Sequence, residues 1–381
     1  MNLVGGKFRR SMRSFSGGLF APLFFFFAAF SVAQGHSATP SAVPNITPSG
    51  SSIALHASST INVASEMGGA FMSSSKCDAD GNLYIRKLAV DRPLLGPVVK
   101  IDPDGKRTAL FDPAVFSQLA LERADAFSPA FDGGMYQIAQ SGILKPKIYV
   151  LHFFSDGSPS SPILLDADFE VYAFAAFANG NFLVSGVKRD VQDRDDRGHN
   201  FTAVFSADGR ELAQLSFPEP RQKAQGPAKA GAKLTTGGRQ RNARTDDDKD
   251  AEKPILDLVD AEAGSDGNLY VMRGSSPALV YVIAPSGKIA KTIKVFAPLP
   301  GAAPNSFHLS ENRLAIEFWN DESQSQTVIV ADAQTGRKIA TYADATEVGT
   351  SFACYSANAG VFSFLKLGEG NALEVIRAVP Q

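Results

Sequence analysis

The residues best suited to chemistry in this chain form a charged run at positions 189–199. The run reads Arg-Asp-Val-Gln-Asp-Arg-Asp-Asp-Arg-Gly-His, and its carboxylates could bind a hard cation such as Ca²⁺. Arginines are interleaved with the carboxylates, however, and the regular spacing of a calcium loop is missing. We therefore favour a solvated, self-neutralising surface segment. Its candidates for contact with a ligand are Asp193, Asp195, Asp196 and His199.

A second set of candidates is expected at the ends of strands on the same face of the protein. Trp319 is followed by Asn-Asp-Glu, and an indole beside carboxylates suits recognition of a carbohydrate or a cation. The alternative is that these side chains only cap the ends of hydrophobic strands. The candidates are Arg86, Lys87, Arg273, Glu317 and Trp319.

Signals for catalysis are weak. His308 could transfer protons, but no nucleophile or carboxylate can be paired with it from the sequence, and a lone histidine more often satisfies a local hydrogen bond. The chain has no Ser-His-Asp order, CxxC pair, HExxH motif or phosphate-binding glycine loop. We therefore name no catalytic residue and expect no metal and no cofactor.

The elements that position these groups repeat along the chain. A strand, a Gly or Asn turn and a second strand return about every 45 to 52 residues, most clearly at 78–85 and 265–271. Between the third and fourth units the spacing is 87, and removing the low-complexity stretch 221–253 leaves about 54. Six units of four short strands predict an all-β, six-bladed β-propeller. The units are aligned on Leu83, Met135, Phe182, Leu269, Leu314 and Val361.

The last unit is one strand short, because the chain ends at Gln381. Residues 51–58 alternate between apolar and polar side chains and precede the first unit. We expect this segment to close the ring as the outer strand of the last blade, paired with 371–378. The alternative is a stray piece of the N-terminal tether.

The two cysteines occupy similar places in the first and last units. Cys77 lies six residues before Leu83, and Cys354 lies seven before Val361. Ring closure would make these units neighbours, so a disulfide between the two cysteines is predicted. Two buried free thiols are the alternative.

The turn sequences resemble a known repeat. Asp-Gly-Asn-Leu-Tyr-Ile at 80–85 and Asp-Gly-Asn-Leu-Tyr-Val at 266–271 resemble NHL-type repeats of six-bladed, TolB-like propellers, and at the level of fold the resemblance covers about residues 50–380. NHL units typically carry an Asp just after this strand, where this chain has Lys87 and Arg273. Some propellers of six blades are gluconolactonase-like hydrolases, with a metal held by Glu, Asn and Asp on inner strands. The inner strands that we assign carry mostly Phe, Ala and Ser.

The long connections between strands indicate which face of the propeller binds a ligand. Turns between the first and second strands and between the third and fourth share one face, and the remaining connections share the other. The long segments 186–200 and 218–253 belong to the second set, which we call the long-loop face. The insertion at about 218–254 is basic and then acidic and too polar for a core, so we expect disorder there. A basic docking segment is the alternative.

The N-terminus predicts export. Residues 1–33 combine basic residues, an apolar stretch at 19–30 and a small-residue cleavage site, typical of a signal peptide. A membrane anchor is the alternative, but about 12 apolar residues fall short of the roughly 20 that a span needs. We expect a flexible linker at 34–50, a propeller at 51–381, an extracytoplasmic (secreted or periplasmic) location, and no membrane span after signal removal.

Composition narrows the function. The formal net charge is −2, so no global field attracts nucleic acid. We predict a non-catalytic binding or scaffold module for a protein or carbohydrate ligand on the long-loop face. The alternative is a metal-dependent hydrolase or lyase of the gluconolactonase-like type.

Overall fold

The computed structural model describes residues 52–68, 71–142, 147–165, 169–188, 199–217, 258–343, 348–349 and 351–381. The predicted signal peptide, the linker at 34–50, most of the charged run with Asp193, Asp195 and Asp196, and the predicted insertion at about 218–254 lie outside these ranges. His199 begins a strand, but its side chain is not among those described.

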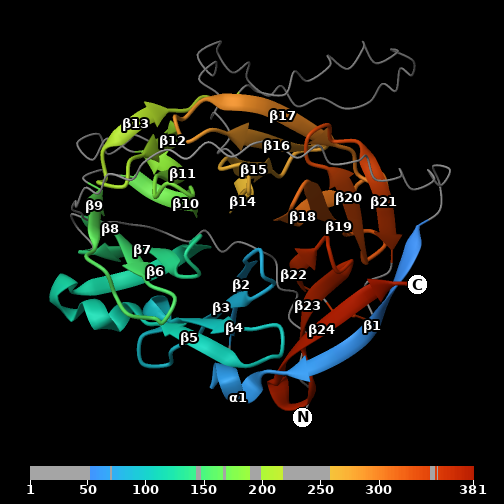
Figure 1. The fold of residues 1–381 in the computed structure, drawn as a ribbon, viewed down its shortest axis with the longest axis horizontal. Helices are drawn as coiled ribbons and strands as arrows, with labels where there is room; N and C mark the ends of the chain where they lie inside the picture. The colour runs from blue at the N-terminus through green and yellow to red at the C-terminus, as the bar shows by residue number, and fades with distance from the viewer. Residues whose placement is uncertain are drawn as a thin grey trace, which may run out of the picture.

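The described chain folds into a ring of twisted antiparallel sheets, a β-propeller (Figure 1). Four sheets have four strands each, in sequence order from the centre to the rim. The first contains β2 (Phe71–Cys77), β3 (Leu83–Lys87), β4 (Val98–Ile101) and β5 (Arg107–Phe111). The second contains β6 (Leu121–Pro129), β7 (Met135–Ser141), β8 (Lys147–Phe153) and β9 (Ile163–Leu165). The third contains β10 (Phe169–Ala176), β11 (Phe182–Lys188), β12 (His199–Phe205) and β13 (Glu211–Gln214). The fourth contains β14 (Leu258–Ala263), β15 (Leu269–Arg273), β16 (Ala278–Ile283) and β17 (Ile289–Val295).

A fifth sheet has eight strands, in the order β18-β19-β20-β21-β1-β24-β23-β22. One half contains β18 (Ala303–Ser310), β19 (Arg313–Asn320), β20 (Ser325–Asp332) and β21 (Lys338–Ala343). The other half contains β22 (Ser351–Ser356), β23 (Val361–Leu367), β24 (Leu373–Pro380) and the N-terminal strand β1 (Ile53–Asn62). The helices are short: α1 (Ala64–Met67), η1 (Pro93–Leu95), η2 (Pro113–Leu119) and η5 (Glu369–Asn371).

At the rim, the N-terminal strand β1 pairs with the C-terminal strand β24. As predicted, it pairs antiparallel with β24, from Leu55 opposite Pro380 to Asn62 opposite Glu374. It is longer than the expected 51–58 segment, and it also pairs in parallel with β21 through Ile53 and Ala54. The second pairing was not predicted, and it merges the last two groups of strands into one sheet.

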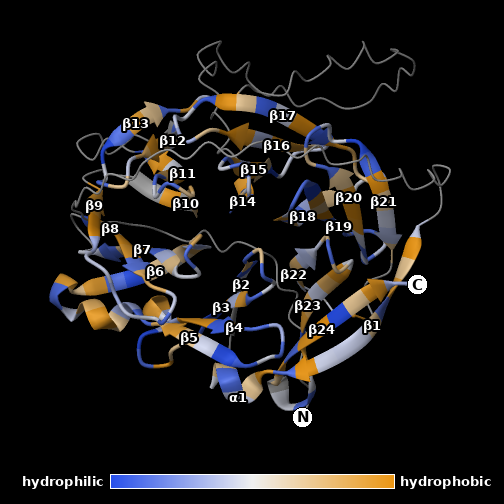
Figure 2. Cartoon of the chain, in the orientation of Figure 1, coloured by the Kyte–Doolittle hydropathy of each residue, from blue (hydrophilic) through white to orange (hydrophobic). Residues whose placement is uncertain are grey.

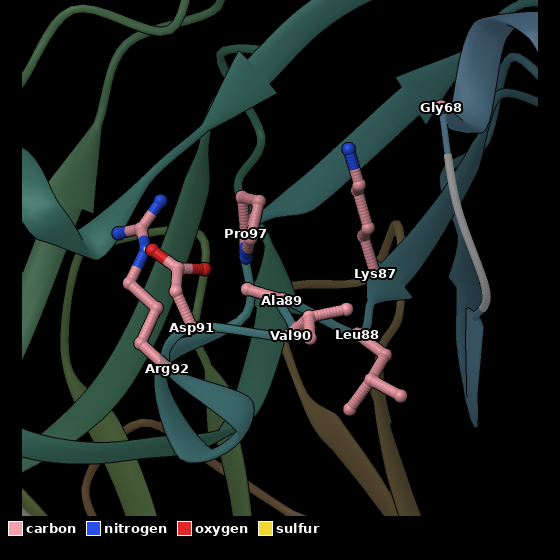
Figure 3. Close-up of a pocket in the computed structure, with 8 residues that line it drawn as sticks. All are labelled: Gly68, Lys87, Leu88, Ala89, Val90, Asp91, Arg92 and Pro97. Atoms are coloured by element: carbon pink, nitrogen blue, oxygen red, sulfur yellow. The ribbon is translucent and has the colours of Figure 1, made fainter.

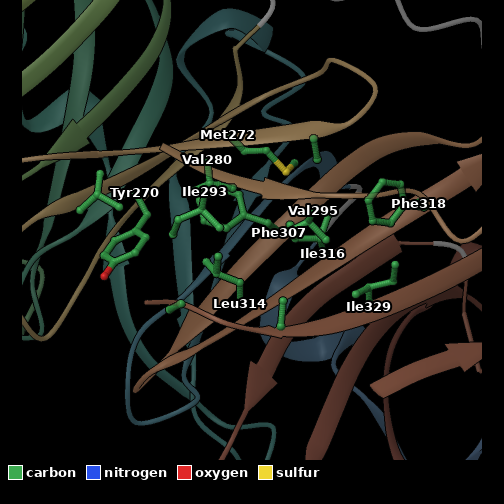
Figure 4. Packing of buried hydrophobic residues seen from close by; sticks show 14 of the residues in the cluster. Tyr270, Met272, Val280, Ile293, Val295, Phe307, Leu314, Ile316, Phe318 and Ile329 are labelled. Carbon is green, nitrogen blue, oxygen red and sulfur yellow. The ribbon is translucent and has the colours of Figure 1, made fainter. Parts of the chain in front are cut away.

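The sheets pack face to face around the ring. Middle strands are buried on both faces, as in β16, because each is covered by the neighbouring sheets. The rim strand β17 alternates between exposed and more buried residues, and Figure 2 shows this change of hydropathy along it. Figure 4 shows one of the cores, in which side chains of β15–β17 meet those of β18–β20. Its largest members include Tyr270, Met272, Phe307 and Phe318.

The short turns depend on glycine where the backbone needs positive φ. Gly105 has φ +85°, and a Cβ atom there would collide with the side chain of Ile61 on β1. This turn of the first sheet therefore packs directly against the strand that closes the ring.

A disulfide joins the first and last groups of strands near the centre. It links Cys77 at the end of β2 to Cys354 on β22, with a Cα separation of 5.6 Å. The similar positions of the two cysteines in the first and last repeat units predicted this disulfide. Elements that are 277 residues apart are thus held together both at the centre and at the rim.

None of the helices in the described ranges is long and apolar enough to span a membrane.

Candidate functional site

A small pocket lies on the long-loop face, at the connection between β3 and β4 (Figure 3). Its volume is about 290 Å³. The loop turns through η1 and exposes apolar side chains, with Val90 93% exposed. The pocket is lined by Gly68, Lys87, Leu88, Ala89, Val90, Asp91, Arg92 and Pro97.

Arg92 forms an ion pair with another residue of this chain. Its guanidinium donates two hydrogen bonds to the Asp112 carboxylate, at 2.7 and 2.8 Å. Partial burial favours a raised pKa for Asp112, but the Arg92 hydrogen bonds, the Ala114 N–H and nearby positive charges outweigh it, so the pKa is lowered. Asp112 therefore stays ionised, and the pair fixes one wall of the pocket.

Lys87 is the pocket cation that remains for a ligand. Within the described ranges, no hydrogen bond or ion pair engages its ammonium group. A Cβ atom added to Gly68 would lie 3.3 Å from Lys87 Nζ, so glycine leaves room around this group. A lysine ammonium beside apolar walls can bind an anionic group such as a carboxylate.

Arg86, the neighbour of Lys87, supports the loop from below. It is 2% exposed, and its Nη2 donates to Leu94 O at 3.0 Å. Because Arg86 is buried and bonded to the loop, it stabilises the loop and does not face a ligand.

Glu317 and Arg273 are also buried, at 1% and 7% exposure. Glu317 Oε2 accepts hydrogen bonds from Asn305 Nδ2 at 2.7 Å and Ser306 Oγ at 2.6 Å, and its Oε1 accepts from Gln326 Nε2 at 2.6 Å. This carboxylate ties together neighbouring strands β18, β19 and β20. It belongs to the interior of the sheet.

Trp319 is partly exposed at the end of β19. Its indole Nε1 donates to Asp321 Oδ1 at 3.1 Å. The structure thus places Trp319 beside a carboxylate, as the sequence indicated. It is not a lining residue of the Lys87 pocket.

A second polar cluster lies on the inner strands, and of its members the sequence had indicated only His308. We call Lys76 of β2, Asp260 and Glu262 of β14, and His308 of β18 the inner-strand cluster. Lys76 forms an ion pair with Asp260, and its Nζ donates to Ala261 O at 3.1 Å. His308 Nδ1 lies 2.8 Å from Glu262 Oε1.

His308 is buried but electrostatically favoured as a cation. Burial alone would lower its pKa, but the charge and hydrogen bond of Glu262, with the charge of Asp260, outweigh burial and raise the pKa above its ordinary value. Glu262 Oε2 also accepts from Leu309 N at 2.6 Å, which holds the carboxylate in place.

The inner-strand cluster can hold charge and protons. In the part of the chain that the structure describes, no group of three or more His, Cys, Asp or Glu side chains is arranged to hold a metal ion. Asp260 and Glu262 left a signal in the sequence, because residues two apart on a strand share a face. The expectation that inner strands carry mostly Phe, Ala and Ser overlooked this strand.

Comparison with known proteins gives distant likenesses only. No protein-family model matches the chain, and no curated protein matches it. A gluconolactonase from Xanthomonas campestris is 12% identical, with a TM-score of 0.42 over 84% of this chain and 89% of that one. A TolB structure from Agrobacterium tumefaciens is 11% identical, with a TM-score of 0.43 over 84% and 96%. The Dos1 propeller is 9% identical, with a TM-score of 0.40 over 82% and 78%.

Proposed function

We propose that this protein is an exported, six-bladed propeller of the NHL-repeat type that acts as a non-catalytic binding or scaffold module. Taking each half of the eight-stranded sheet as one blade supports the count of six. The turns at 80–85 and 266–271 support the repeat type, and the pattern of residues 1–33 supports export to an extracytoplasmic location.

The observation that carries this proposal is the pocket on the long-loop face. Its volume, about 290 Å³, lies just below the roughly 300–1,000 Å³ typical of ligand sites. It suits one side chain or one sugar unit rather than a long oligosaccharide. The Lys87 ammonium and the apolar walls fit a ligand that presents a carboxylate, from an acidic protein side chain or an acidic sugar.

Titration with small carboxylates tests the proposal. N-acetyl-L-glutamate represents a protein ligand and D-glucuronate a carbohydrate ligand, with N-acetyl-L-glutamine and D-glucose as neutral counterparts. We expect the acids, and not the neutral compounds, to shift the NMR signals of Lys87 and Asp91. The acid that binds more tightly identifies the source of the ligand.

A matched pair of variants makes the test specific. K87Q should abolish the shifts, because it removes the charge and keeps most of the side-chain length. K366Q is the control, since Lys366 is an exposed lysine near the end of β23, as Lys87 is at the end of β3. Equal responses to acids and neutral compounds, or loss in both variants, would contradict the proposed site.

A metal-dependent hydrolase or lyase is the second candidate function. Its one supporting observation is that the inner strands carry a polar cluster, the His308–Glu262 pair with Asp260 nearby, although no three such groups in the described ranges are arranged to hold a metal ion. Assays of the full chain on sugar lactones with added Ca²⁺ or Mn²⁺ decide between the two. Hydrolysis that is lost with a chelator and restored by the metal would favour this candidate, whereas a binding module should show none.

A further inference from the structure

The two sulfurs of the Cys77–Cys354 disulfide have different surroundings. Cys77 is partly exposed at the end of β2. Cys354 is 3% exposed and packs in an apolar cluster with Leu83 and Leu365. Cys77 packs against the same cluster but is the more exposed residue of the pair, so a thiolate approaching from solvent is expected to reach it first.

His308 places a positive charge against Cys77. Its Nδ1 lies 3.9 Å from Cys77 Sγ. The same nitrogen faces Glu262 Oε1 at 2.8 Å, and Nε2 faces the Phe352 carbonyl oxygen at 3.4 Å. Both ring nitrogens thus face oxygen acceptors, and only the doubly protonated imidazolium can donate to both.

The other charges around this point are paired. On β2, Lys76 binds Asp260 of β14, and on β14, Glu262 binds His308 and the backbone of β18. Strand β22 contributes the Phe352 ring, which packs edge-on against the imidazole at 4.7 Å. The imidazolium is therefore the charged group of the inner-strand cluster that touches the sulfur.

We propose that Cys77–Cys354 is an exchangeable disulfide, in which a small thiol or dithiol attacks Cys77 and His308 then stabilises the Cys77 thiolate that is released. A cation beside a sulfur favours the thiolate over the thiol, so His308 makes Cys77 a better leaving group in the second step of the exchange, when Cys77 is released; attack at Cys77 in the first step follows from its greater exposure. The proposal does not depend on the proposed binding function.

The exchange proceeds in two balanced steps. The external thiolate forms a bond to Cys77 Sγ, the Cys77–Cys354 bond breaks, and its electron pair passes to Cys354, which takes a proton from solvent. A second external thiolate then attacks the external sulfur, and the electron pair returns to Cys77 beside His308. Two external thiols are oxidised to a disulfide, and the protein disulfide is reduced to two thiols.

Exchange would loosen the centre of the ring without opening it. The disulfide holds β2 to β22, whereas β1 closes the rim through its pairing with β24. The outer closure stays in place when the inner one is broken.

Single-thiol variants test the asymmetry. C354S leaves Cys77 free, and C77S leaves Cys354 free, so no reductant is needed. The rate of alkylation by iodoacetamide is measured from pH 5 to 9.5. For C354S, we expect a midpoint clearly below the usual value of about 8.5. For C77S, alkylation should be slow throughout, because Cys354 is buried.

Removing the imidazolium tests its role. In C354S/H308Q the midpoint should rise by about one pH unit, which corresponds to roughly a tenfold lower thiolate fraction near pH 6.5. H308Q leaves Glu262 buried without its partner, so C354S/H308Q/E262Q, with two neutral amides, provides a second variant that avoids this penalty. A midpoint at or above about 8.5 in C354S, or no change in either variant, would overturn the proposal.

Two measurements on the full chain complete the test. After incubation with 2-mercaptoethanol and acid quenching, peptide mass spectrometry should find the mixed disulfide on Cys77, and finding it on Cys354 would overturn the mechanism. In dithiothreitol buffers, the equilibrium constant for reduction should be about tenfold higher for wild type than for H308Q/E262Q. Equal constants would also count against it.

Discussion

Leu55 tests whether β1 stabilises the ring. This side chain is 6% exposed, and it packs against residues from both halves of the eight-stranded sheet, including Val328 and Phe362. Its neighbour His56 is exposed on the opposite face of the same strand. L55A therefore removes a contact that joins the two halves, and H56A is the matched control.

The expected loss follows from the size of the deletion. Replacing a buried leucine by alanine costs about 2–5 kcal/mol, depending on how far the site can collapse. Leu55 is on a strand whose other side chains are mostly exposed, so the site can relax, and we expect about 2–3 kcal/mol. H56A should stay within about 0.5 kcal/mol of wild type.

Urea unfolding followed by circular dichroism measures the difference. With a slope of about 3 kcal/mol per molar urea, L55A should lower the midpoint by about 1 M with no change in slope. If L55A and H56A unfold alike, β1 is a dispensable surface strand and the argument for closure at the rim fails.

Two further predictions concern the centre of the ring. C77S/C354S removes a link between residues 277 positions apart. The chain-entropy model gives about 5–6 kcal/mol as the upper bound of the resulting loss in the free energy of unfolding. Identical denaturation curves of wild type with and without reductant would contradict this prediction. Because the pKa of His308 is raised on folding, its charged form stabilises the fold fully below the unfolded pKa of about 6.5, and this contribution is lost as pH rises through the folded pKa. The stability difference between wild type and H308Q should therefore shrink with rising pH, and a difference that grows would refute the assignment.

The repeat made most of the fold predictable. Local turn chemistry recurs in each unit, and a unit with one strand missing demands a partner from elsewhere in the chain. This logic located β1 against β24. The parallel pairing of Ile53 and Ala54 with β21 has no such signal, because it depends on how closely two strands approach at the rim.

The candidate site was less predictable, for two different reasons. Arg86 and Arg273 lie at the ends of their strands as expected, whereas Glu317 lies inside β19. All three are buried, because burial depends on loops and neighbouring strands that the sequence pattern does not define. Glu262 and His308 were predictable in principle. They are 46 residues apart, close to one repeat, so they occupy equivalent places on neighbouring inner strands. Lys76 and Asp260, 184 residues apart, left no comparable signal.

The two closures of the ring differ in what they can do. The β1–β24 pairing at the rim consists of many backbone hydrogen bonds and can be lost only by unfolding a strand. The disulfide at the centre is a single bond that thiol exchange can break and reform, and a charged imidazole contacts one of its sulfurs. If both served only for stability, the central bond would gain nothing from a buried ion pair at its side, since burying such a pair costs desolvation that apolar packing avoids. The His308–Glu262 pair stabilises the fold while it is charged, but its place against Cys77 is explained by an effect on that sulfur rather than by a need of the apolar core.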